Sequence, residues 1–358
     1  MIRNKIFDKR PLLIAGPCSA ETEEQVLNTA YQLKTAGITL FRAGIWKPRT
    51  RPNNFEGVGS VGLKWLQKVK EQTGMLVTTE VANKSHVESA LRHGIDVLWL
   101  GARTTVNPFS VQEIADALQG VDIPVMIKNP INPDLQLWTG AIERIQKAGI
   151  QDIALIHRGF ASYGESFYRN KPQWNIPIEL KRNFPDLPMI CDMSHICGRR
   201  DILKEVAQKA MNLDYDGLMT EVHERPDEAW SDAAQQITPF EYKRMMERME
   251  WYRESRENLT KEGLSDIRLK IDRLDTQLLK ALEKRMKLVD EIGKFKKQNH
   301  IPILQTARWN EILEQALVRG RKNGLSEAFL IKILDAIHEE SINRQHRILN
   351  DEGSISTT

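Results

Sequence analysis

The sequence is poor in cysteine and has no long apolar run. Its three cysteines, Cys18, Cys191 and Cys197, are too few and too odd in number for a disulfide framework, so we expect free thiols or metal ligands in a reducing compartment. No run of about eighteen apolar residues occurs, which predicts no membrane-spanning helix and no membrane partner. The N-terminal residues also lack the layout of a secretion signal, and we therefore expect a cytoplasmic protein.

An excess of charge of one sign is missing as well. Lys and Arg number 51 and Asp and Glu 48, which gives a net charge of +3 at pH 7. A nucleic-acid-binding protein needs a basic stripe, so this balance predicts no nucleic-acid partner. An apolar content of 41% and a charged content of 28% are typical of a globular protein, and 358 residues suit a large domain with a smaller one.

The first 225 residues contain eight short apolar segments that favour strands, separated by segments with the pattern of helices. Such alternation predicts an α/β fold with a parallel sheet, and eight units in this length predict a (β/α)8 TIM barrel. A doubly wound open sheet is the alternative, but no G-x-G-x-x-G motif follows the first segment. The predicted strands are 11–16, 38–44, 75–81, 96–102, 124–129, 152–159, 188–194 and 217–223.

The remaining sequence predicts a small all-α domain. Apolar residues recur at helical spacing in 264–298, and Pro302 and Gly324 separate this long helix from two more, at 306–322 and 326–349. The first helix is too long to bury its apolar face within one chain, so we expect a homodimer. The predicted domains are a barrel at 1–238, a helical linker at 239–263, the helical domain at 264–350 and a disordered tail at 351–358.

Polar side chains follow every predicted strand, and four of them form a set suited to a metal ion. The chemistry of a TIM barrel lies at the C-terminal ends of its strands, so these side chains should share one rim. A thiol, an imidazole and two carboxylates suit Mn²⁺, Fe²⁺, Co²⁺ or Zn²⁺. Cys191 and Cys197 lack the spacing of a zinc site and are interpreted as structural. The predicted metal ligands are Cys18, His195, Glu221 and Asp232.

The same rim is rich in cations. Arginine and lysine at the end of a strand suit phosphate and carboxylate groups, and there are more of them than one phosphate needs. We therefore expect two anionic substrates. Arg199 and Arg200 either lie near an anion site or open the next helix. The predicted anion-binding residues are Arg42, Lys47, Arg49, Arg103, Lys128 and Arg158.

Several blocks of the barrel segment resemble one enzyme family. "AGPCSAE", "FRAGIWKPRTRPNNFEGVG", "IHRG", "DMSHICGRRD" and "DGLMTEVHERPDEAWSD" are similar to the signature blocks of DAHP synthase, type I β subfamily. The resemblance implies metal-dependent condensation of phosphoenolpyruvate with erythrose 4-phosphate, the first step toward chorismate and the aromatic amino acids. By position, Cys18, His195, Glu221 and Asp232 match the family's metal ligands.

The resemblance also assigns the cations. Arg103, Lys128 and Arg158 match the site for the phosphoenolpyruvate phosphate, and Lys47 and Arg42 lie near its carboxylate. The loop after Lys47 matches the erythrose 4-phosphate end through Arg49 and Thr50, with Arg51 in place of the family's commoner serine.

Two points stay open for the barrel. His157, Glu80 or a metal-bound water could handle the proton of the condensation. The sister enzyme 3-deoxy-D-manno-octulosonate 8-phosphate synthase shares the barrel and much of the metal site, but it carries a "KANRS"-type loop where this sequence has "KPRT". It remains the alternative.

The helical segment is similar to the AroQ class of chorismate mutase. The similarity implies rearrangement of chorismate to prephenate, with Lys296 and Gln345 facing the ether oxygen and Arg268 reaching the partner subunit's site. Gln305 and Trp309 depart from an aspartate and a glutamate of the family. The residues on substrate-contacting positions are Arg268, Arg285, Lys296, Arg308, Ser341 and Gln345.

A different hypothesis makes the helical segment a non-catalytic module for dimerisation and sensing. Trp309 favours that alternative, because it replaces a substrate-contacting residue. Both hypotheses are compatible with feedback, in which prephenate or chorismate binds the helical domain and changes the rate of the barrel.

Overall fold

The computed structural model describes residues 6–47, 55–164, 167–251 and 262–350. The predictions made for Arg49, Thr50 and Arg51, and for the tail at 351–358, lie outside these residues. The chain divides into two compact units, Met1–Tyr252 and Arg253–Thr358. The first unit includes helix α10 (Pro239–Glu247), which packs against α1 (Glu23–Thr35) although it falls in the predicted linker.

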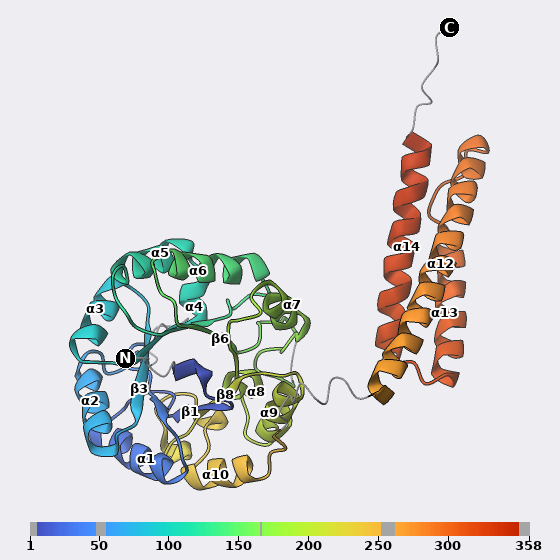
Figure 1. Cartoon of the computed structure of the whole chain (residues 1–358). Coiled ribbons are helices and arrows are strands. Elements are labelled where there is room, and N and C mark those ends of the chain that lie inside the picture. The colour runs from blue at the N-terminus through green and yellow to red at the C-terminus, as the bar shows by residue number, and fades with distance from the viewer. Residues whose placement is uncertain (1–5, 48–54, 165–166, 252–261, 351–358) are drawn as a thin grey trace. The chain divides into compact units, whose positions relative to one another are not determined.

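The first unit is a closed barrel of parallel strands (Figure 1). Each strand pairs with the next, and β1 pairs with β8 from Leu12 opposite Gly217 to Gly16 opposite Glu221. Closure between the first and last strands excludes the open sheet and confirms the predicted TIM barrel. All eight predicted segments contain a strand: β1 (Leu12–Gly16), β2 (Leu40–Arg42), β3 (Leu76–Val81), β4 (Val97–Leu100), β5 (Val125–Lys128), β6 (Ile153–His157), β7 (Met189–Asp192) and β8 (Gly217–Glu221).

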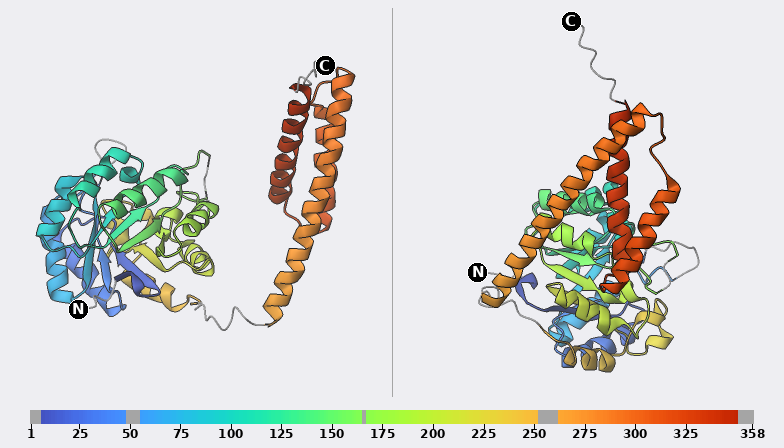
Figure 2. Two further views of the ribbon diagram at one scale, coloured as in Figure 1. Left: turned by 45° about the horizontal axis from the view of Figure 1, so that its top comes forward. Right: turned by 90° about the vertical axis from the view of Figure 1, so that its right-hand side faces the viewer.

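Helices surround the strands, as the two further views also show (Figure 2). Many begin at a side chain that caps the first turn; Asp134, for example, accepts a hydrogen bond from the backbone N–H of Leu137. Besides α1 and α10, the helices of this unit are α2 (Val61–Thr73), α3 (Lys84–Arg92), α4 (Ala102–Thr105), α5 (Pro108–Ala117), α6 (Leu135–Lys147), α7 (Asn175–Asn183), α8 (Met193–Cys197) and α9 (Leu203–Asn212).

The strands separate two apolar cores. One core fills the inside of the barrel and contains Trp99, Met126 and Ile156, and the other lies between the strands and the helices and contains Leu155 and Cys191. Successive side chains of a strand point to opposite faces, so each strand contributes alternately to the two cores. This alternation decides which residues at a strand end reach the inside of the rim.

The second unit consists of three helices: α12 (Glu262–Gln298), α13 (Thr306–Lys322) and α14 (Glu327–Asn350). They confirm the predicted helices to within two residues. The Ser326 hydroxyl accepts a hydrogen bond from the Phe329 backbone N–H, which caps α14 as its sequence predicts. Both α12 and α13 pack against α14. Among the described residues, no helix is long and apolar enough to cross a membrane.

Candidate active site

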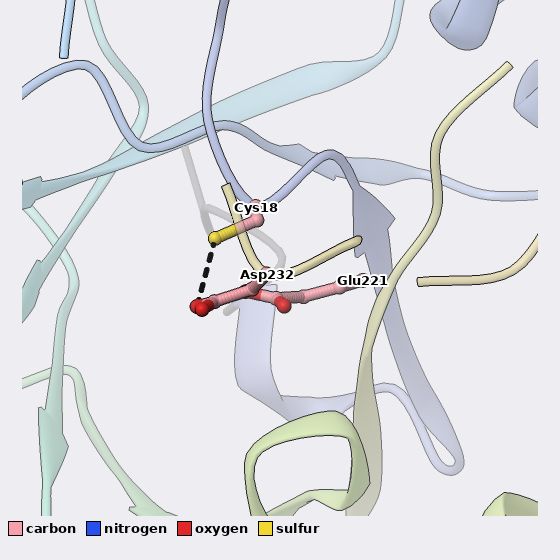
Figure 3. A group of neighbouring side chains, drawn as sticks. All are labelled: Cys18, Glu221 and Asp232. Carbon is pink, nitrogen blue, oxygen red and sulfur yellow. Dashed lines mark hydrogen bonds between the residues drawn. The ribbon is translucent and has the colours of Figure 1, made fainter. Parts of the chain in front are cut away.

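Three of the four predicted metal ligands meet at one point of the rim. Cys18 follows β1, Glu221 ends β8, and Asp232 lies in the loop beyond β8. One ligand atom from each lies within 4.8 Å of the other two, and the Cys18 Sγ is 3.4 Å from Asp232 Oδ2 (Figure 3). Strands β1 and β8 are neighbours in the closed barrel, so their adjacent ends bring Cys18 and Glu221 together.

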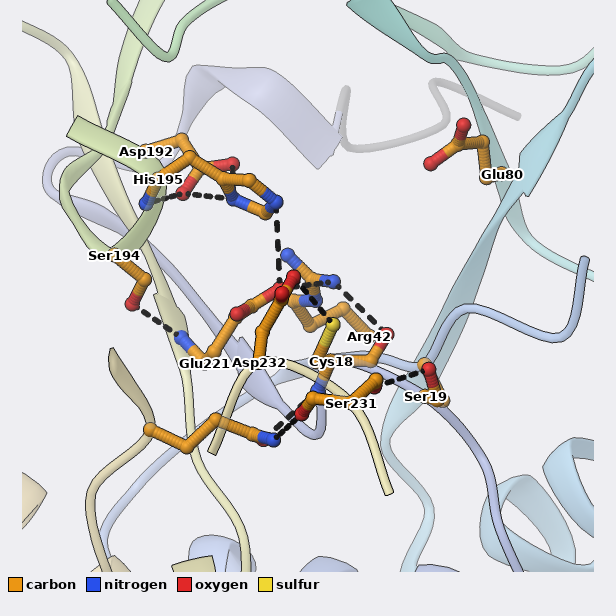
Figure 4. A network of polar contacts seen from close by, with 12 residues as sticks. Cys18, Ser19, Arg42, Glu80, Asp192, Ser194, His195, Glu221, Ser231 and Asp232 are labelled. Atoms are coloured by element: carbon orange, nitrogen blue, oxygen red, sulfur yellow. Dashed lines mark hydrogen bonds and ion pairs between the residues drawn. The ribbon is translucent and has the colours of Figure 1, made fainter. Parts of the chain in front are cut away.

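The fourth predicted ligand, His195, adjoins this cluster. It lies in the short helix α8, directly after β7, and its Nε2 is 3.6 Å from Glu221 Oε1 (Figure 4). Asp192 caps α8 by accepting from the His195 backbone N–H, and it also lies 2.8 Å from His195 Nδ1. An ionised Asp192 can only accept, so Nδ1 carries the proton and Nε2 keeps the lone pair that faces the cluster.

The cluster has the electrostatics of a cation site. Burial, together with the nearby Glu221, raises the pKa of the Cys18 thiol to about 12. Burial also opposes ionisation of Asp232, but Arg169 and other nearby cations outweigh it and hold that pKa below its ordinary value. The carboxylates are therefore ready as ligands, whereas the thiol requires a cation to replace its proton.

Two buried cations line the inner face beside the cluster. Arg42 ends β2, and its Nη2 lies 3.1 Å from Glu221 Oε1. Lys128 ends β5 and lies 2.8 Å from Asp192 Oδ2; burial lowers the pKa of Lys128 although Asp192 opposes the shift. Both lie over the ring of Trp99. None of the described residues pairs with Arg42 Nε or Nη1, so these buried donors are available to an anion.

Arg158 and Arg103 lie on the same rim. Arg158 follows β6, is buried, and donates to Asn170 Oδ1 over 2.7 Å, while its backbone N–H donates to Asn129 Oδ1. Burial lowers the pKa of Arg158 to about 10, and the nearby charge of Arg103 contributes to that shift. Arg103 itself is exposed in α4. An arginine held by neutral amides keeps its charge available for an anionic substrate.

Lys47 contacts the metal-ligand cluster directly. Its Nζ lies 3.3 Å from the Cys18 Sγ. A cation at this distance favours the thiolate form of Cys18, in the same sense as a bound metal ion would. The predicted neighbours Arg49 and Thr50 lie outside the described residues.

His157 does not reach the cluster. It is the fifth residue of β6 and shares the outer face with Ile153 and Leu155, so it points into the core beneath the helices. Its Nε2 lies 2.7 Å from the Pro172 carbonyl oxygen and its Nδ1 2.9 Å from the Tyr215 hydroxyl. Burial lowers its pKa to about 3, so the ring is neutral and both nitrogens are occupied.

Of the other charged residues of the rim, one faces the site and two are paired with carboxylates away from it. Glu80 is on the inner face of β3 and accepts a hydrogen bond of 3.1 Å from Trp99 Nε1, so it faces the site. Arg199 pairs with Asp201, and Arg200 with Asp227 and the Ala233 carbonyl. These two arginines precede α9 and already have carboxylate partners, which favours the helix-opening alternative.

Two residues that the sequence analysis did not single out contact the ligands. Arg169 Nη1 lies 3.1 Å from Asp232 Oδ1, and Gln235 Nε2 donates to Glu221 Oε2 over 2.6 Å. A clue was present for Gln235, which follows Asp232 closely in "SDAAQQI". Arg169 follows a stretch without strand or helix signals and offered none.

A second polar group gathers in the helical unit. Arg285 Nη1 of α12 donates to the Ser341 hydroxyl of α14 over 2.7 Å. Lys296 is buried and donates to the Ile303 carbonyl, and Gln345 is buried beside Ser341. None of the described residues pairs with Gln345 Oε1. The structure thus brings Arg285, Ser341 and Gln345 together between α12 and α14, and it buries Lys296 further along α12.

The remaining mutase residues lie apart from that group. Arg268 is exposed on α12, and Arg308 is exposed and paired with Glu311 at 2.8 Å. Trp309, which replaces a glutamate of the family, stacks on His338 with ring centroids 4.0 Å apart. His338 is three residues before Ser341 and lies on the same face of α14.

The fold and its rim define a class: a barrel enzyme whose strand ends bring a thiol and two carboxylates together beside buried arginine and lysine side chains. Comparison with known proteins agrees with this class. Residues 5–258 match the DAHP synthetase I family, and residues 267–346 match chorismate mutase type II. Phospho-2-dehydro-3-deoxyheptonate aldolase of Thermotoga maritima is 30% identical over 66% of this chain and 68% of its own length.

Two further similarities concern structure and the sister enzyme. The crystal structure of the Thermotoga maritima enzyme superposes with a TM-score of 0.59 at 28% identity, covering 66% of this chain and 67% of that one. The 2-dehydro-3-deoxyphosphooctonate aldolase of Geotalea daltonii is 30% identical over 65% of this chain and 89% of its length. The chain belongs to the DAHP synthetase I family and carries a chorismate mutase domain after the barrel in the sequence, a fusion that supports both enzyme activities.

Proposed function

We propose that the barrel condenses phosphoenolpyruvate with erythrose 4-phosphate to DAHP in a metal-dependent reaction. One observation carries the proposal: the donor cluster of Cys18, Glu221 and Asp232 lies beside the buried cations Arg42 and Lys128 on the inner face of one rim. Such a rim can hold a divalent cation and two anionic substrates together.

The residues present suit a divalent ion. Glu221 Oε1 is buried and lies 3.1 Å from Arg42 Nη2 and 3.6 Å from His195 Nε2, so it faces the site, where a divalent ion can take the place of the Arg42 contact. The buried thiol, imidazole and carboxylates would hold Mn²⁺, Fe²⁺, Co²⁺ or Zn²⁺. An ion bound there supplies Lewis-acid polarisation of a carbonyl oxygen.

The protein's own residues orient the two substrates. Arg103, Lys128 and Arg158 hold the phosphate of phosphoenolpyruvate, and Arg42 and Lys47 hold its carboxylate. Arg49 and Thr50 hold the erythrose 4-phosphate end. Holding both substrates in this way places C3 of phosphoenolpyruvate against the aldehyde carbon of erythrose 4-phosphate, and a carbon–carbon bond forms between them. Water then adds at C2 of the former phosphoenolpyruvate, and phosphate leaves.

The proton of the condensation is assigned to Glu80 or to water. Glu80 lies on the inner face of β3 and is bonded to the indole that underlies Arg42 and Lys128. Both ring nitrogens of His157 are engaged on the far side of β6, so a structural role is preferred for it.

A free buried thiol ligand also fits a reducing, cytoplasmic compartment.

The octulosonate synthase remains the alternative for the barrel. The 30% identity to the Geotalea daltonii enzyme is a reason to keep it. We prefer DAHP synthase because the loop after Lys47 has "KPRT". Product formed from arabinose 5-phosphate but not from erythrose 4-phosphate would overturn this choice.

For the helical unit we propose the rearrangement of chorismate to prephenate. This pericyclic reaction needs no nucleophile, only a site that clamps a diaxial conformer and stabilises charge on the ether oxygen. Arg285 and Arg268 hold the two carboxylates, and Lys296 and Gln345 donate to the ether oxygen. Arg308 and Ser341 complete the contacts. The pairing of Arg285 with Ser341 supports this arrangement.

A homodimer is proposed to form through α12. Its apolar face is exposed in the single chain: Leu274 and Leu278 have exposed fractions of 62% and 57%. A row of exposed leucines along one helix of a single chain indicates an interface. Arg268 lies on the same exposed helix, from which it can enter the partner's site. The alternative, a sensing module without catalysis, predicts no mutase turnover in the full chain.

Chelation separates the two activities. Removal of divalent ions from the full chain should abolish DAHP formation and leave prephenate formation unchanged, and added Mn²⁺ or Zn²⁺ should restore the first. A synthase that survives complete chelation contradicts metal dependence.

Prephenate added to the full chain should slow the synthase if the helical unit gives feedback, and an unchanged rate removes that part of the proposal.

A further inference from the structure

Gln235 is a buried amide that links the metal-ligand cluster to a cation. It lies in the short turn η3 (Ala233–Gln235), directly after Asp232, and its exposed fraction is 1%. Its Nε2 donates to Glu221 Oε2 over 2.6 Å, and its Oε1 accepts from Arg169 Nη1 over 2.5 Å.

The orientation of this amide is determined by its two partners. Arginine has only donors, so the atom that faces Arg169 must be the carbonyl oxygen. The amide nitrogen then faces Glu221, whose carboxylate accepts from it. Arg169 Nη1 also lies 3.1 Å from Asp232 Oδ1. Arg169 and Gln235 therefore contact one oxygen of each carboxylate in the cluster.

The other oxygen of each carboxylate is turned toward the remaining donors. Glu221 Oε1 lies 3.1 Å from Arg42 Nη2 and 3.6 Å from His195 Nε2. Asp232 Oδ2 lies 3.4 Å from the Cys18 Sγ. In each carboxylate, one oxygen thus contacts Gln235 or Arg169, and the other faces the thiol or the imidazole, with Arg42 also beside Glu221 Oε1.

Arg169 is itself held firmly against α8. Its backbone N–H donates to the Cys197 carbonyl over 3.3 Å, and a Cβ at Gly198 would come within 2.4 Å of the Arg169 Cβ. Gly198 ends α8 with a φ of +67°, a conformation that favours glycine. The close approach couples the position of Arg169 to the helix that carries His195.

We propose that Gln235 is a positioning residue that makes Glu221 a one-oxygen metal ligand. It occupies Oε2, so that the divalent ion binds Oε1 in place of the Arg42 contact. Through Arg169 it helps to leave Oδ2 of Asp232 to the ion in the same way. Partners of this kind orient metal ligands and tune the bound ion. The inference rests on the proposed metal dependence of the barrel.

The test replaces the amide in the full chain. Gln235→Met keeps the length of the side chain and removes both hydrogen bonds, and Gln25→Met is the matched control. Gln25 is also buried, and its amide oxygen accepts from the Glu21 backbone N–H instead of contacting a ligand carboxylate. Mn²⁺ affinity is measured from the EPR signal of the free ion, and Co²⁺ absorption reports the coordination number.

We expect Gln235→Met to weaken Mn²⁺ binding by about 10- to 100-fold. The Co²⁺ absorption should also lose intensity, because Glu221 can then bind through both oxygens and raise the coordination number. The control should match the wild type, and mutase turnover should persist in both variants. Equal Mn²⁺ affinity and equal Co²⁺ spectra in Gln235→Met and wild type would overturn the positioning role.

A second variant tests the role if Gln235→Met misfolds, and the wild type tests the proposed metal site. If Gln235→Met does not fold, Arg169→Gln removes the same connection from a side chain that is 40% exposed, and it should weaken Mn²⁺ binding in the same direction. Unchanged binding in that variant contradicts the role. A wild type that binds no divalent ion contradicts the proposed metal site itself, which is a different result from tight binding that is insensitive to Gln235.

Discussion

The two units place their polar and apolar groups in opposite ways. In the barrel, the charged residues Arg42 and Glu221 are fully buried. In the helical unit, long apolar side chains such as Leu274 on α12 are exposed. Buried charge is costly unless it is paired or binds a ligand, and exposed apolar surface is costly unless a partner covers it. The barrel therefore encloses its own candidate site, whereas the exposed apolar face of α12 is the reason for the proposed homodimer.

The two units also differ in which segments of the chain supply the residues of each site. The cluster in the barrel draws on the first and last strands, from Cys18 after β1 to Asp232 beyond β8, because closure makes these two strands neighbours. The group in the helical unit comes from two adjacent helices, with Arg285 on α12 and Ser341 on α14. A barrel site therefore depends on closure of the entire fold, and the helical site on the packing of two elements.

The largest effect is expected from Cys18→Ala. Loss of the buried thiol should cost several kcal/mol of transition-state stabilisation and lower synthase turnover by about a thousandfold or more. Mutase turnover should stay within about twofold of wild type, since Cys18 belongs to the other unit. Rates of both reactions are compared at saturating Mn²⁺. Cys191→Ala, on the outer face of β7, is the control, and an active Cys18→Ala enzyme would reject the ligand assignment.

Lys296→Ala tests the helical unit alone. Removal of a buried donor to the developing oxyanion should cost about 3 kcal/mol, a hundredfold or more in mutase kcat. The synthase rate should not change. The neighbouring Lys297 is exposed and donates to the Ile348 carbonyl, so Lys297→Ala matches the change of charge without entering the site. Near-normal mutase kinetics in Lys296→Ala would favour the sensing module instead.

Leu278→Glu tests whether α12 needs a partner. Burial of one leucine contributes about 2 kcal/mol, and a twofold interface counts it twice, so the dissociation constant of the dimer should rise by about a thousandfold. Sedimentation at several concentrations measures this dissociation. Mutase turnover should fall with the dimer while the synthase continues. An unchanged dimer in this variant would place the interface elsewhere.

The smallest effect concerns His157 and the pH dependence of barrel stability. Burial lowers its pKa to about 3, whereas the ordinary value is 6.5. Below pH 6.5 the unfolded chain binds a proton that the folded chain does not, so stability falls as pH falls, by about 1.4 kcal/mol per pH unit toward pH 3.

Urea unfolding followed by tryptophan fluorescence measures this slope, because Trp309 is the one tryptophan of the helical segment and the other seven belong to the barrel unit. His157→Gln should flatten the decline between pH 6.5 and 5 while DAHP synthesis continues. A lost synthase with an unchanged slope would restore a catalytic role for His157 and break the distinction between the inner and outer faces of the strands.

Much of the rim was accessible from the sequence. Strand ends can be located from apolar segments, and Cys18, Glu221 and Arg42 each follow or end one. The direction of a side chain needs one further step. In β6, Ile156 faces the inside of the barrel, so the next residue, His157, must face outward. Alternation along the strand would have removed His157 from the predicted catalytic set.

The sequence by itself determined the order of the eight strands, the bounds of the three C-terminal helices to within two residues, and the chemical types of the residues at the strand ends. Periodicity and composition are local properties, and they are present before the chain folds. Only the tertiary structure decided that Arg169 and Gln235 hold Glu221 and Asp232, and that α12 keeps an uncovered apolar face. Contacts between distant segments depend on barrel closure and on packing, which no local pattern encodes.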